Sequence, residues 1–204
     1  MGKNEVFEFR GCSELHYAEV TEDSVEAYNT GTVKLLAPVG EIGKTVSQSS
    51  KTIFYDDKPL IVISSEGADT VKFTVPALPL AILAEITGQA YDATTGALFG
   101  GGKKTKYFAV GYRLGGTDNE YRYVWRLKGL FNIPEETSKT ISDGTDTNNQ
   151  SIEFIGVATT HKFIKGGTEP ASRKDVNADT RDGKADVSKW FEEVVTPDTL
   201  KAKA

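Results

Sequence analysis

Cysteine and histidine are scarce in this sequence. Cys12 is the only cysteine among 204 residues, so no disulfide can form within the chain. The two histidines, His16 and His161, together with that thiol cannot fill the four positions of a usual structural zinc site without carboxylates. No two of them have the spacing of metal ligands. We therefore predict no metal, no cofactor, and folding in a reducing cytoplasm.

Long apolar runs and an excess of positive charge are also missing. No apolar run approaches the roughly 18 residues needed to span a bilayer, and no basic segment followed by an apolar one opens the chain. We therefore expect a soluble protein that is not exported and has no membrane partner. With 29 acidic and 24 basic residues, the formal net charge is -5. Tight nucleic-acid binding is unexpected, because such proteins neutralise phosphates with clustered Lys and Arg.

Catalytic motifs are absent as well. The run Gly100–Thr105 resembles a phosphate-binding loop, but Ala97 replaces the first glycine of that motif and Lys104 replaces its Ser or Thr. Asp179–Gly183 resembles part of a calcium loop, yet the first ligand position of such a loop holds Ala178. No G-x-S-x-G segment marks a nucleophile. We interpret Gly100–Thr105 as a flexible turn and predict that the protein is not an enzyme.

What is present is the pattern of a mainly β protein. There are 20 glycines, which indicates many turns, and 38% of the residues are hydrophobic, enough for a sizeable core. Runs of alternating or β-branched apolar residues predict strands, and the polar stretch Ser142–Gln150 predicts a turn before the last of them. The predicted strands are Val6–Phe9, Leu15–Val20, Thr32–Ala37, Leu60–Ser64, Val71–Val75, Tyr107–Leu114, Tyr121–Leu130 and Ser151–Phe163.

The clearest local signal is a long antiparallel hairpin formed by Tyr107–Leu114 and Tyr121–Leu130. The connecting residues, Gly115–Glu120, include the glycines and asparagine that adopt the positive φ angles of a tight turn. Alternation gives the second strand an apolar face and a basic face. We interpret the basic face as solvated or as a subunit contact. The apolar face holds Tyr121, Tyr123, Trp125 and Leu127, and the basic face holds Arg122, Val124, Arg126 and Lys128.

Two segments have helical spacing. Ala77–Thr87 carries apolar residues at i, i+3, i+4 and i+7, and Gly88 follows its end, which predicts a short helix packed on the sheet. Asp186–Val195 repeats the pattern, with Trp190 and Phe191 on its apolar stripe. A short helix that exposes two aromatic side chains needs a surface to dock against. That surface belongs either to the same subunit or to a neighbour.

Two stretches contain too few apolar residues to form a core of their own. Gly166–Lys184 is polar and charged, which predicts an extended arm or linker. Val39–Pro59 is rich in glycine and serine, and a connection this long in a compact domain is usually functional or disordered. The strand predicted after it, Leu60–Ser64, reads as fully buried. The scattered apolar residues of the long connection are Val46, Ile53, Phe54 and Tyr55.

The order of these features resembles the major tail proteins of siphophages, especially phages that infect Gram-positive bacteria. The likeness covers roughly residues 5–165, and the succession of segments carries it. These segments are Leu15–Ala18, Val20–Asp23, Tyr28–Leu36 (YNTGTVKLL), Pro38–Ile42, Thr52–Asp57 (TIFYDD) and the hairpin Tyr107–Lys128.

This resemblance implies a β-sandwich or half-barrel with one flanking helix over residues 1–165, and a C-terminal extension over residues 166–204. Six copies would close into a ring, and stacked rings would form the tail tube through which DNA leaves the virion. Residues 39–59 would be the loop that reaches the next ring. The implied partners are copies of the same chain, the tape measure, tail terminator and distal tail proteins, and phage DNA in transit. The implied location is the tail of the virion.

Two sets of candidate residues follow from the implied assembly. Apolar residues without a place in the chain's own core would be buried between subunits, where lateral pairing also covers open sheet edges. Acidic residues on the channel wall would keep DNA from binding, since fixed cations add salt-dependent affinity. The interface candidates are Val46, Ile53, Phe54, Tyr55, Trp190 and Phe191, and the channel-wall candidates are Asp56, Asp57, Glu66 and Asp69.

Three alternatives remain open from the sequence. A tube protein of a contractile phage tail would share the same architecture. A β-sandwich module that binds a carbohydrate or a receptor would need an exposed aromatic platform, for which Tyr121, Tyr123 and Trp125 are candidates. An enzyme could assemble catalytic residues from distant positions, and its turnover would be lost on replacing His16 or His161.

Overall fold

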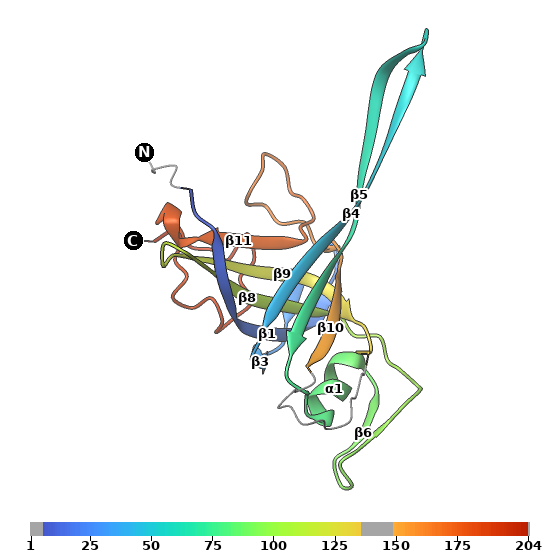
Figure 1. The fold of residues 1–204 in the computed structure, drawn as a ribbon, viewed down its shortest axis with the longest axis vertical. Coiled ribbons are helices and arrows are strands. Elements are labelled where there is room, and N and C mark those ends of the chain that lie inside the picture. The colour runs from blue at the N-terminus through green and yellow to red at the C-terminus, as the bar shows by residue number, and fades with distance from the viewer. Residues whose placement is uncertain (1–5, 136–148, 204) are drawn as a thin grey trace, which may run out of the picture.

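The computed structural model describes residues 6–135 and 149–203, which form a mainly β protein (Figure 1). One large antiparallel sheet has the strand order β2-β1-β8-β9-β10-β5-β4, with β3 also paired to β1 and β11 to β9, and β6 and β7 form a separate two-stranded sheet. The elements are β1 (Phe9–Asp23), β2 (Tyr28–Thr30), β3 (Lys34–Ala37), β4 (Glu41–Tyr55), β5 (Lys58–Val75), α1 (Leu80–Thr87), β6 (Ala90–Asp92), β7 (Ala97–Phe99), β8 (Phe108–Gly116), β9 (Tyr121–Phe131), β10 (Gln150–Gly156), β11 (Asp175–Asp179) and the short 3-10 helix η1 (Thr180–Asp182).

Strand β1 is longer than either strand predicted near it. Only Phe9 of the strand predicted over residues 6–9 belongs to β1, whereas the strand predicted over residues 15–20 lies entirely within it. Gly11 and Glu14 have φ angles of 94° and 61°, and the register of β1 against β8 shifts near each of them. A bulge of this kind inserts an extra residue while the strands stay paired on both sides of it. It also interrupts the alternation of side chains, which is why the sequence pattern does not predict residues 10–14 as strand.

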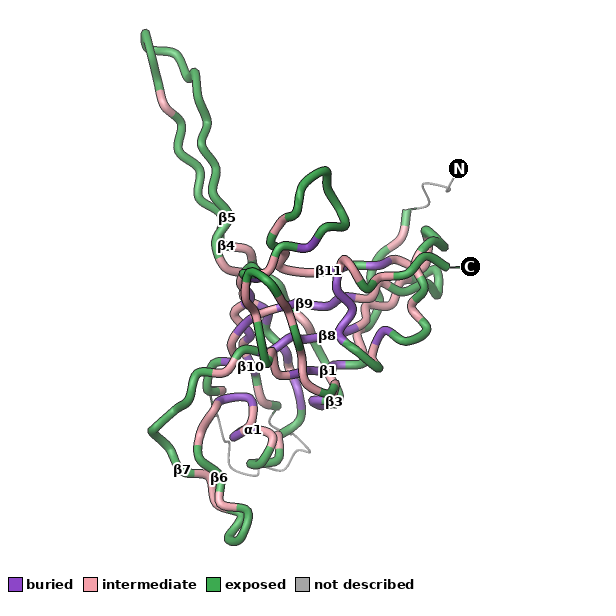
Figure 2. The backbone as a smooth tube through the Cα atoms, turned by 180° about the vertical axis from the view of Figure 1, so that it is seen from behind, coloured by how far each residue is buried: buried purple, intermediate pink, exposed green. Residues whose placement is uncertain are grey.

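Apolar side chains are buried on both faces of the sheet, and Figure 2 shows the buried residues concentrated along its central strands. On one face, Phe73 and Val124 belong to a cluster that Ile86 of α1 joins. On the other face, Trp125 packs with Trp190 from the C-terminal segment. Successive residues of a strand point to opposite faces, so β9 supplies both clusters. The predicted mainly β fold with one flanking helix is confirmed.

The strongest local predictions are also confirmed. Strands β8 and β9 form the expected hairpin, paired from Phe108 with Gly129 to Gly115 with Tyr121. Helix α1 ends at Gly88, which has a φ of 72° and donates its N–H to the carbonyl of Ala84 at 2.9 Å. This left-handed cap is the conformation that favours glycine at the end of a helix.

The C-terminal segment is an integral layer of the fold. Strand β11 pairs with the N-terminal half of β9, so the predicted linker over residues 166–184 is wrong there. The predicted helix over residues 186–195 is wrong too, because residues 188–194 form successive turns. The N–H of Trp190, for example, donates to the carbonyl of Val187 at 3.2 Å, a spacing of three residues instead of the four of an α-helix.

Strands β4 and β5 differ most from the sequence predictions. The loop predicted over residues 39–59 is mostly strand, and the strand predicted as fully buried over residues 60–64 has exposed apolar side chains. Together the two strands make a hairpin that extends far beyond the sheet (Figure 1). The backbones of β4 and β5 pair along the whole hairpin. This pairing explains why β4 is a strand although its side chains show little apolar alternation.

Two further predictions concern the segment before the C-terminal layer. The last strand predicted from the sequence, residues 151–163, ends at Gly156 as β10, and residues 157–162 form no strand. The polar turn predicted over residues 142–150 lies almost entirely outside the described residues.

Candidate functional site

The most prominent candidate site is the free part of the β4–β5 hairpin, residues 47–66, which we call the arm. Strand β10 pairs with β5 only from Asp69 to Val75, so the arm has no strand beside either of its edges within the described chain. At about 3.3 Å per residue, its strands carry the tip roughly 30 Å beyond the sheet. Figure 1 shows the arm standing clear of every other element.

The tip of the arm is a tight two-residue turn. Asp56 and Asp57 have φ angles of 49° and 59°, between the paired residues Tyr55 and Lys58. Two consecutive left-handed residues define the turn type whose twist matches that of a β-hairpin, and aspartate tolerates this conformation better than most residues. The conformation of this turn is therefore one reason why two aspartates occupy the outermost point of the molecule.

The arm exposes large apolar side chains on both of its faces. Ile53 lies opposite Ile61, and cross-strand partners of this kind share a face. Val62 lies opposite Thr52 and therefore projects from the other face. The exposed fractions are 71% for Leu60, 66% for Val62, 61% for Phe54, 56% for Tyr55, 54% for Ile63 and 44% for Ile61. Figure 2 shows almost the whole arm as exposed.

This construction is unfavourable for a surface that stays in water. A two-stranded hairpin is at best marginally stable alone, and unpaired edges with apolar side chains favour association with another chain. Contiguous exposed apolar residues on a folded protein mark interaction sites. The arm therefore has the physical properties of a segment that is completed by another surface.

The base of the arm is fixed by a buried charge cluster. Asp69 is 1% exposed and Arg126 is 4% exposed, and the Nη1 of Arg126 lies 3.2 Å from the Oδ2 of Asp69. Lys44 and Lys174 approach the same carboxylate at 3.2 and 3.3 Å, and Arg126 also pairs with Asp175. The cluster ties β4, β5, β9 and β11 together at the point where the arm leaves the sheet.

The channel-wall candidates consequently separate into three environments. Asp69 is buried in the charge cluster and does not face solvent, so that prediction is wrong for this residue. Glu66 is exposed and accepts a hydrogen bond from the Nζ of Lys174 at 2.9 Å. Asp56 and Asp57 are exposed at the tip of the arm, far from the sheet.

The interface candidates separate in the same way. Phe54 and Tyr55 are exposed on the arm, Ile53 is partly exposed there, and Val46 is partly exposed just before the arm begins. Trp190 is 1% exposed within its own subunit, which corrects its assignment to a subunit interface. The sequence pattern did not distinguish these groups because both consist of apolar side chains in otherwise polar segments.

Trp190 and Phe191 cover the second face of the sheet. The Nε1 of Trp125 donates to the backbone carbonyl of Trp190 at 2.8 Å. The ring of Phe191 stacks on His16, with 4.5 Å between centroids. Trp125 is fully buried as a result, so Tyr121, Tyr123 and Trp125 do not form the exposed aromatic platform that a carbohydrate-binding module would need.

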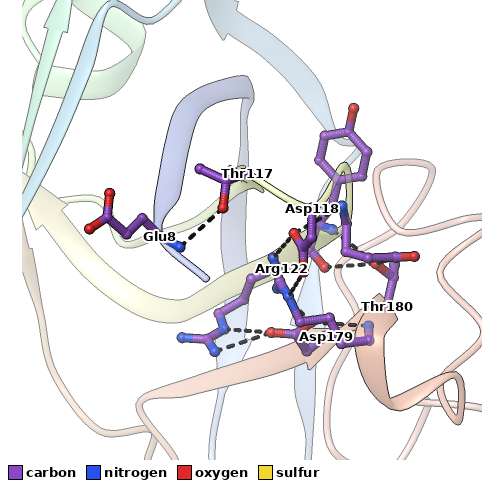
Figure 3. A network of polar contacts seen from close by, with 9 residues as sticks. Glu8, Thr117, Asp118, Arg122, Asp179 and Thr180 are labelled. Carbon is purple, nitrogen blue, oxygen red and sulfur yellow. Dashed lines mark hydrogen bonds and ion pairs between the residues drawn. The ribbon is translucent and has the colours of Figure 1, made fainter. Parts of the chain in front are cut away.

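Carboxylates neutralise the basic face predicted for β9. The Nη2 of Arg122 lies 3.1 Å from the Oδ2 of Asp179, and Figure 3 shows this pair beside the turn of the β8–β9 hairpin. Arg126 belongs to the buried cluster, and Lys128 pairs with Asp23. These three cations therefore do not offer a free basic strip to a phosphate backbone.

Asp23 illustrates how firmly these pairs are held. The backbone N–H groups of Thr160 and His161 donate to its carboxylate at 2.8 and 2.9 Å, alongside the Lys128 ammonium. Burial by itself raises the pKa of this carboxyl group, but the three hydrogen-bond donors outweigh burial and hold the pKa below its ordinary value. Asp23 thus links β1 to the segment after β10.

The described residues contain neither a metal-binding cluster nor a membrane-spanning helix. Within residues 6–135 and 149–203, no three His, Cys, Asp or Glu side chains gather closely enough to hold a metal ion. No helix among those residues has both the length and the apolar composition required to cross a membrane.

No protein-family model matches the chain, and no curated protein matches it either. The arm is the principal candidate because it exposes large apolar side chains.

Proposed function

We propose that this chain is a structural protein that polymerises through its arm, as the tail tube subunit of a long-tailed phage. The observation that carries the proposal is the exposure of large apolar side chains on both faces of residues 47–66. Burying aliphatic and aromatic side chains of this size contributes roughly 1.5–3 kcal/mol each. A second copy of the chain would supply that cover in a stacked assembly.

The body of the protein supports the same interpretation. Its sheet is open, with the short strand β2 at one edge and the long strand β4 at the other. Unpaired edges are removed when identical subunits close a ring, as six copies would do in a tube. The buried cluster around Asp69 and Arg126 would hold the arm in one direction, which repeated stacking requires.

The distribution of charge favours a conduit for DNA over a protein that binds DNA. The chain has a net charge of -5, and the three cations of the β9 face are paired with carboxylates. Cations that are paired with carboxylates contribute little salt-dependent attraction to passing phosphates. In this proposal the tape measure, tail terminator and distal tail proteins are the further partners, and the virion tail is the location.

Electron microscopy of the concentrated full-length protein tests the proposal. We expect rings or tubes, and strictly monomeric particles would overturn it. Affinity of such a monomer for a glycan would favour the alternative, a carbohydrate- or receptor-binding module.

A variant with residues 48–66 replaced by Asn-Gly tests the role of the arm. The replacement keeps the base of the hairpin and closes it with a favourable turn. We expect a folded protein with unchanged cooperative unfolding that does not form tubes. Tubes of normal length from this variant would show that stacking does not depend on the arm.

A further inference from the structure

The end of the molecule opposite the arm carries a second set of uncovered apolar side chains. Helix α1 and the β6–β7 hairpin form this end, and Figure 1 shows it and the arm at opposite ends of the longest axis. We call it the acceptor end and define it by Leu80, Tyr91, Phe99, Lys103 and Lys104. Because β6 and β7 pair only with each other, this hairpin also lacks cover from the main sheet.

We propose that the arm of one copy docks on the acceptor end of the next copy. This inference rests on the proposed function and adds to it the surface that receives the arm. Leu80, Tyr91 and Phe99 are 46%, 39% and 55% exposed, so the acceptor end offers both aliphatic and aromatic surface to the arm. Apolar side chains on both partners are desolvated together when such surfaces meet.

The charges of the two ends are complementary. Asp56 and Asp57 are exposed at the tip of the arm, and Lys103 and Lys104 are exposed at the acceptor end. The backbone N–H of Lys104 donates to the carbonyl of Gly88 at 2.9 Å, which fixes these lysines beside the end of α1. Opposite charges on facing surfaces orient partners and determine their register.

Acidic groups near this end offset its positive charge only in part. Glu85 pairs with Lys34 at 2.6 Å, whereas Asp92 accepts hydrogen bonds from Thr94 and Thr95 at 2.8 and 2.6 Å and keeps its negative charge. Lys103 and Lys104 take part in no ion pair with the described residues. Both side chains are exposed, so the carboxylates of another copy can reach them.

Docking between two different surfaces determines the form of the assembly. Each copy has one arm and one acceptor end on opposite sides, so every added copy presents a new arm. A heterologous contact of this kind propagates along an axis, whereas pairing of two arms would stop at a dimer. The geometry therefore predicts growth in layers along the long axis of the subunit.

A complementation experiment with two variants tests the pairing. The arm variant has residues 48–66 replaced by Asn-Gly, and the acceptor variant is L80S/F99S, which changes only exposed side chains. We expect neither variant alone to stack beyond one layer in electron microscopy and sedimentation velocity. An equimolar mixture should form two-layer species, because the arm of the acceptor variant can still dock on the acceptor end of the arm variant. The control V25S/I164S removes two apolar side chains that are 76% and 71% exposed elsewhere, and it should stack like the wild type.

The outcomes separate this inference from the proposed function. If the wild-type protein never assembles, the proposed function fails. If the wild type and the acceptor variant form equally long tubes, or if the control also loses stacking, polymerisation stands but the acceptor end is wrong. An acceptor variant that pairs as dimers through its arms would likewise overturn the inference.

Charge variants test the same contact independently of apolar surface. D56N/D57N removes both carboxylates but keeps residues that tolerate the left-handed turn. We expect this variant and K103E/K104E each to raise the concentration needed for stacking by about tenfold, the equivalent of roughly 1.4 kcal/mol. Combining D56N/D57N with K103E/K104E should be no worse than K103E/K104E alone, since the repulsion between the two ends has been removed. Stacking unaffected by either charge variant would contradict the proposed pairing.

Discussion

The β8–β9 and β4–β5 hairpins have the same local construction but opposite surroundings. Both are long antiparallel pairs joined by short turns, and both carry bulky apolar side chains. Strands β8 and β9 lie in the middle of the sheet, where Val124 and Trp125 are buried on opposite faces. The arm exposes Phe54 and Val62 to solvent instead. The contrast teaches that neighbouring layers, and not the hairpin itself, determine where the apolar side chains are buried.

The largest loss of stability is expected from a substitution in the β8–β9 hairpin. Trp125 is fully buried and bonded to the C-terminal segment, so Trp125→Ala leaves a large cavity and frees the Trp190 carbonyl. We expect a loss of about 3–5 kcal/mol in the free energy of unfolding, measured by urea denaturation. A loss below about 1 kcal/mol would mean that the C-terminal layer does not cover the sheet.

The buried charge cluster at the base of the arm is expected to be nearly as sensitive to substitution. Asp69→Ala removes the carboxylate that faces buried Arg126, leaving three cations with less compensation. Breaking a buried ion pair is strongly destabilising, and we expect a loss of about 3 kcal/mol in urea denaturation. The matched control is Glu66→Ala, which removes an exposed partner of Lys174 and should cost less than about 1 kcal/mol. Equal losses of stability in the two variants would argue against a buried charge cluster at this position.

A pair of glycine substitutions compares packing in the two hairpins. A Cβ added at Gly111 of β8 would lie 2.8 Å from the Trp125 ring, whereas one added at Gly43 of β4 would meet no atom within 4 Å. We expect Gly111→Ala to cost about 1–3 kcal/mol through overpacking and Gly43→Ala to cost nothing measurable. Thermal unfolding of both variants checks this, and a neutral Gly111→Ala would show that the ring can move aside.

The pH dependence of stability should distinguish a carboxylate of the body from one of the arm. Because the folded-state pKa of Asp23 is lowered, its contribution is present above the unfolded-state pKa of about 4 and is lost as pH falls through the folded-state pKa. Asp23→Asn should therefore destabilise the protein at pH 7 and flatten the loss of stability below about pH 4. Asp57→Asn is the control, since this side chain makes no hydrogen bond or ion pair with the described residues. If the urea midpoints of the two variants shift equally at pH 7 and below about pH 4, the pH dependence does not come from Asp23.

The smallest expected effect on stability comes from the arm. F54S/L60S removes two exposed apolar side chains, and for the dilute monomer we expect a change within about 0.5 kcal/mol in urea denaturation. The same variant should lose self-association under the proposed function. A loss above about 1.5 kcal/mol would mean that these residues pack within the monomer, and the contrast between the hairpins would disappear.

Much of the fold could be predicted from local patterns. The β8–β9 strands, α1 with its glycine cap and the mainly β composition depend on side-chain period and turn chemistry, which nearby residues carry. The C-terminal helix was mispredicted because the spacing of Trp190 and Phe191 suits a helix and a series of turns equally. Strand β11 was missed because five residues in a polar segment give little signal until β9 lies beside them.

The candidate site could be predicted only in part. Phe54 and Tyr55 stood out because their segment has little other apolar content. Residues 60–64 were assigned to the core because a continuous aliphatic run is normally buried. Asp69 was grouped with the other acids of the arm because nothing in the local sequence identifies Arg126, which is distant in the chain, as its partner.

The sequence by itself determined the local features: strand pairing in hairpins, the positions of the turns, one capped helix and a single thiol that excludes an internal disulfide. Only the tertiary structure decided which apolar segments are buried, because burial depends on layers contributed by distant parts of the chain. Residues 188–194 cover Trp125 and close one face of the sheet. Among the described residues, no layer covers the arm beyond the contact of Lys174 with Glu66 at its base, so its aliphatic side chains stay exposed.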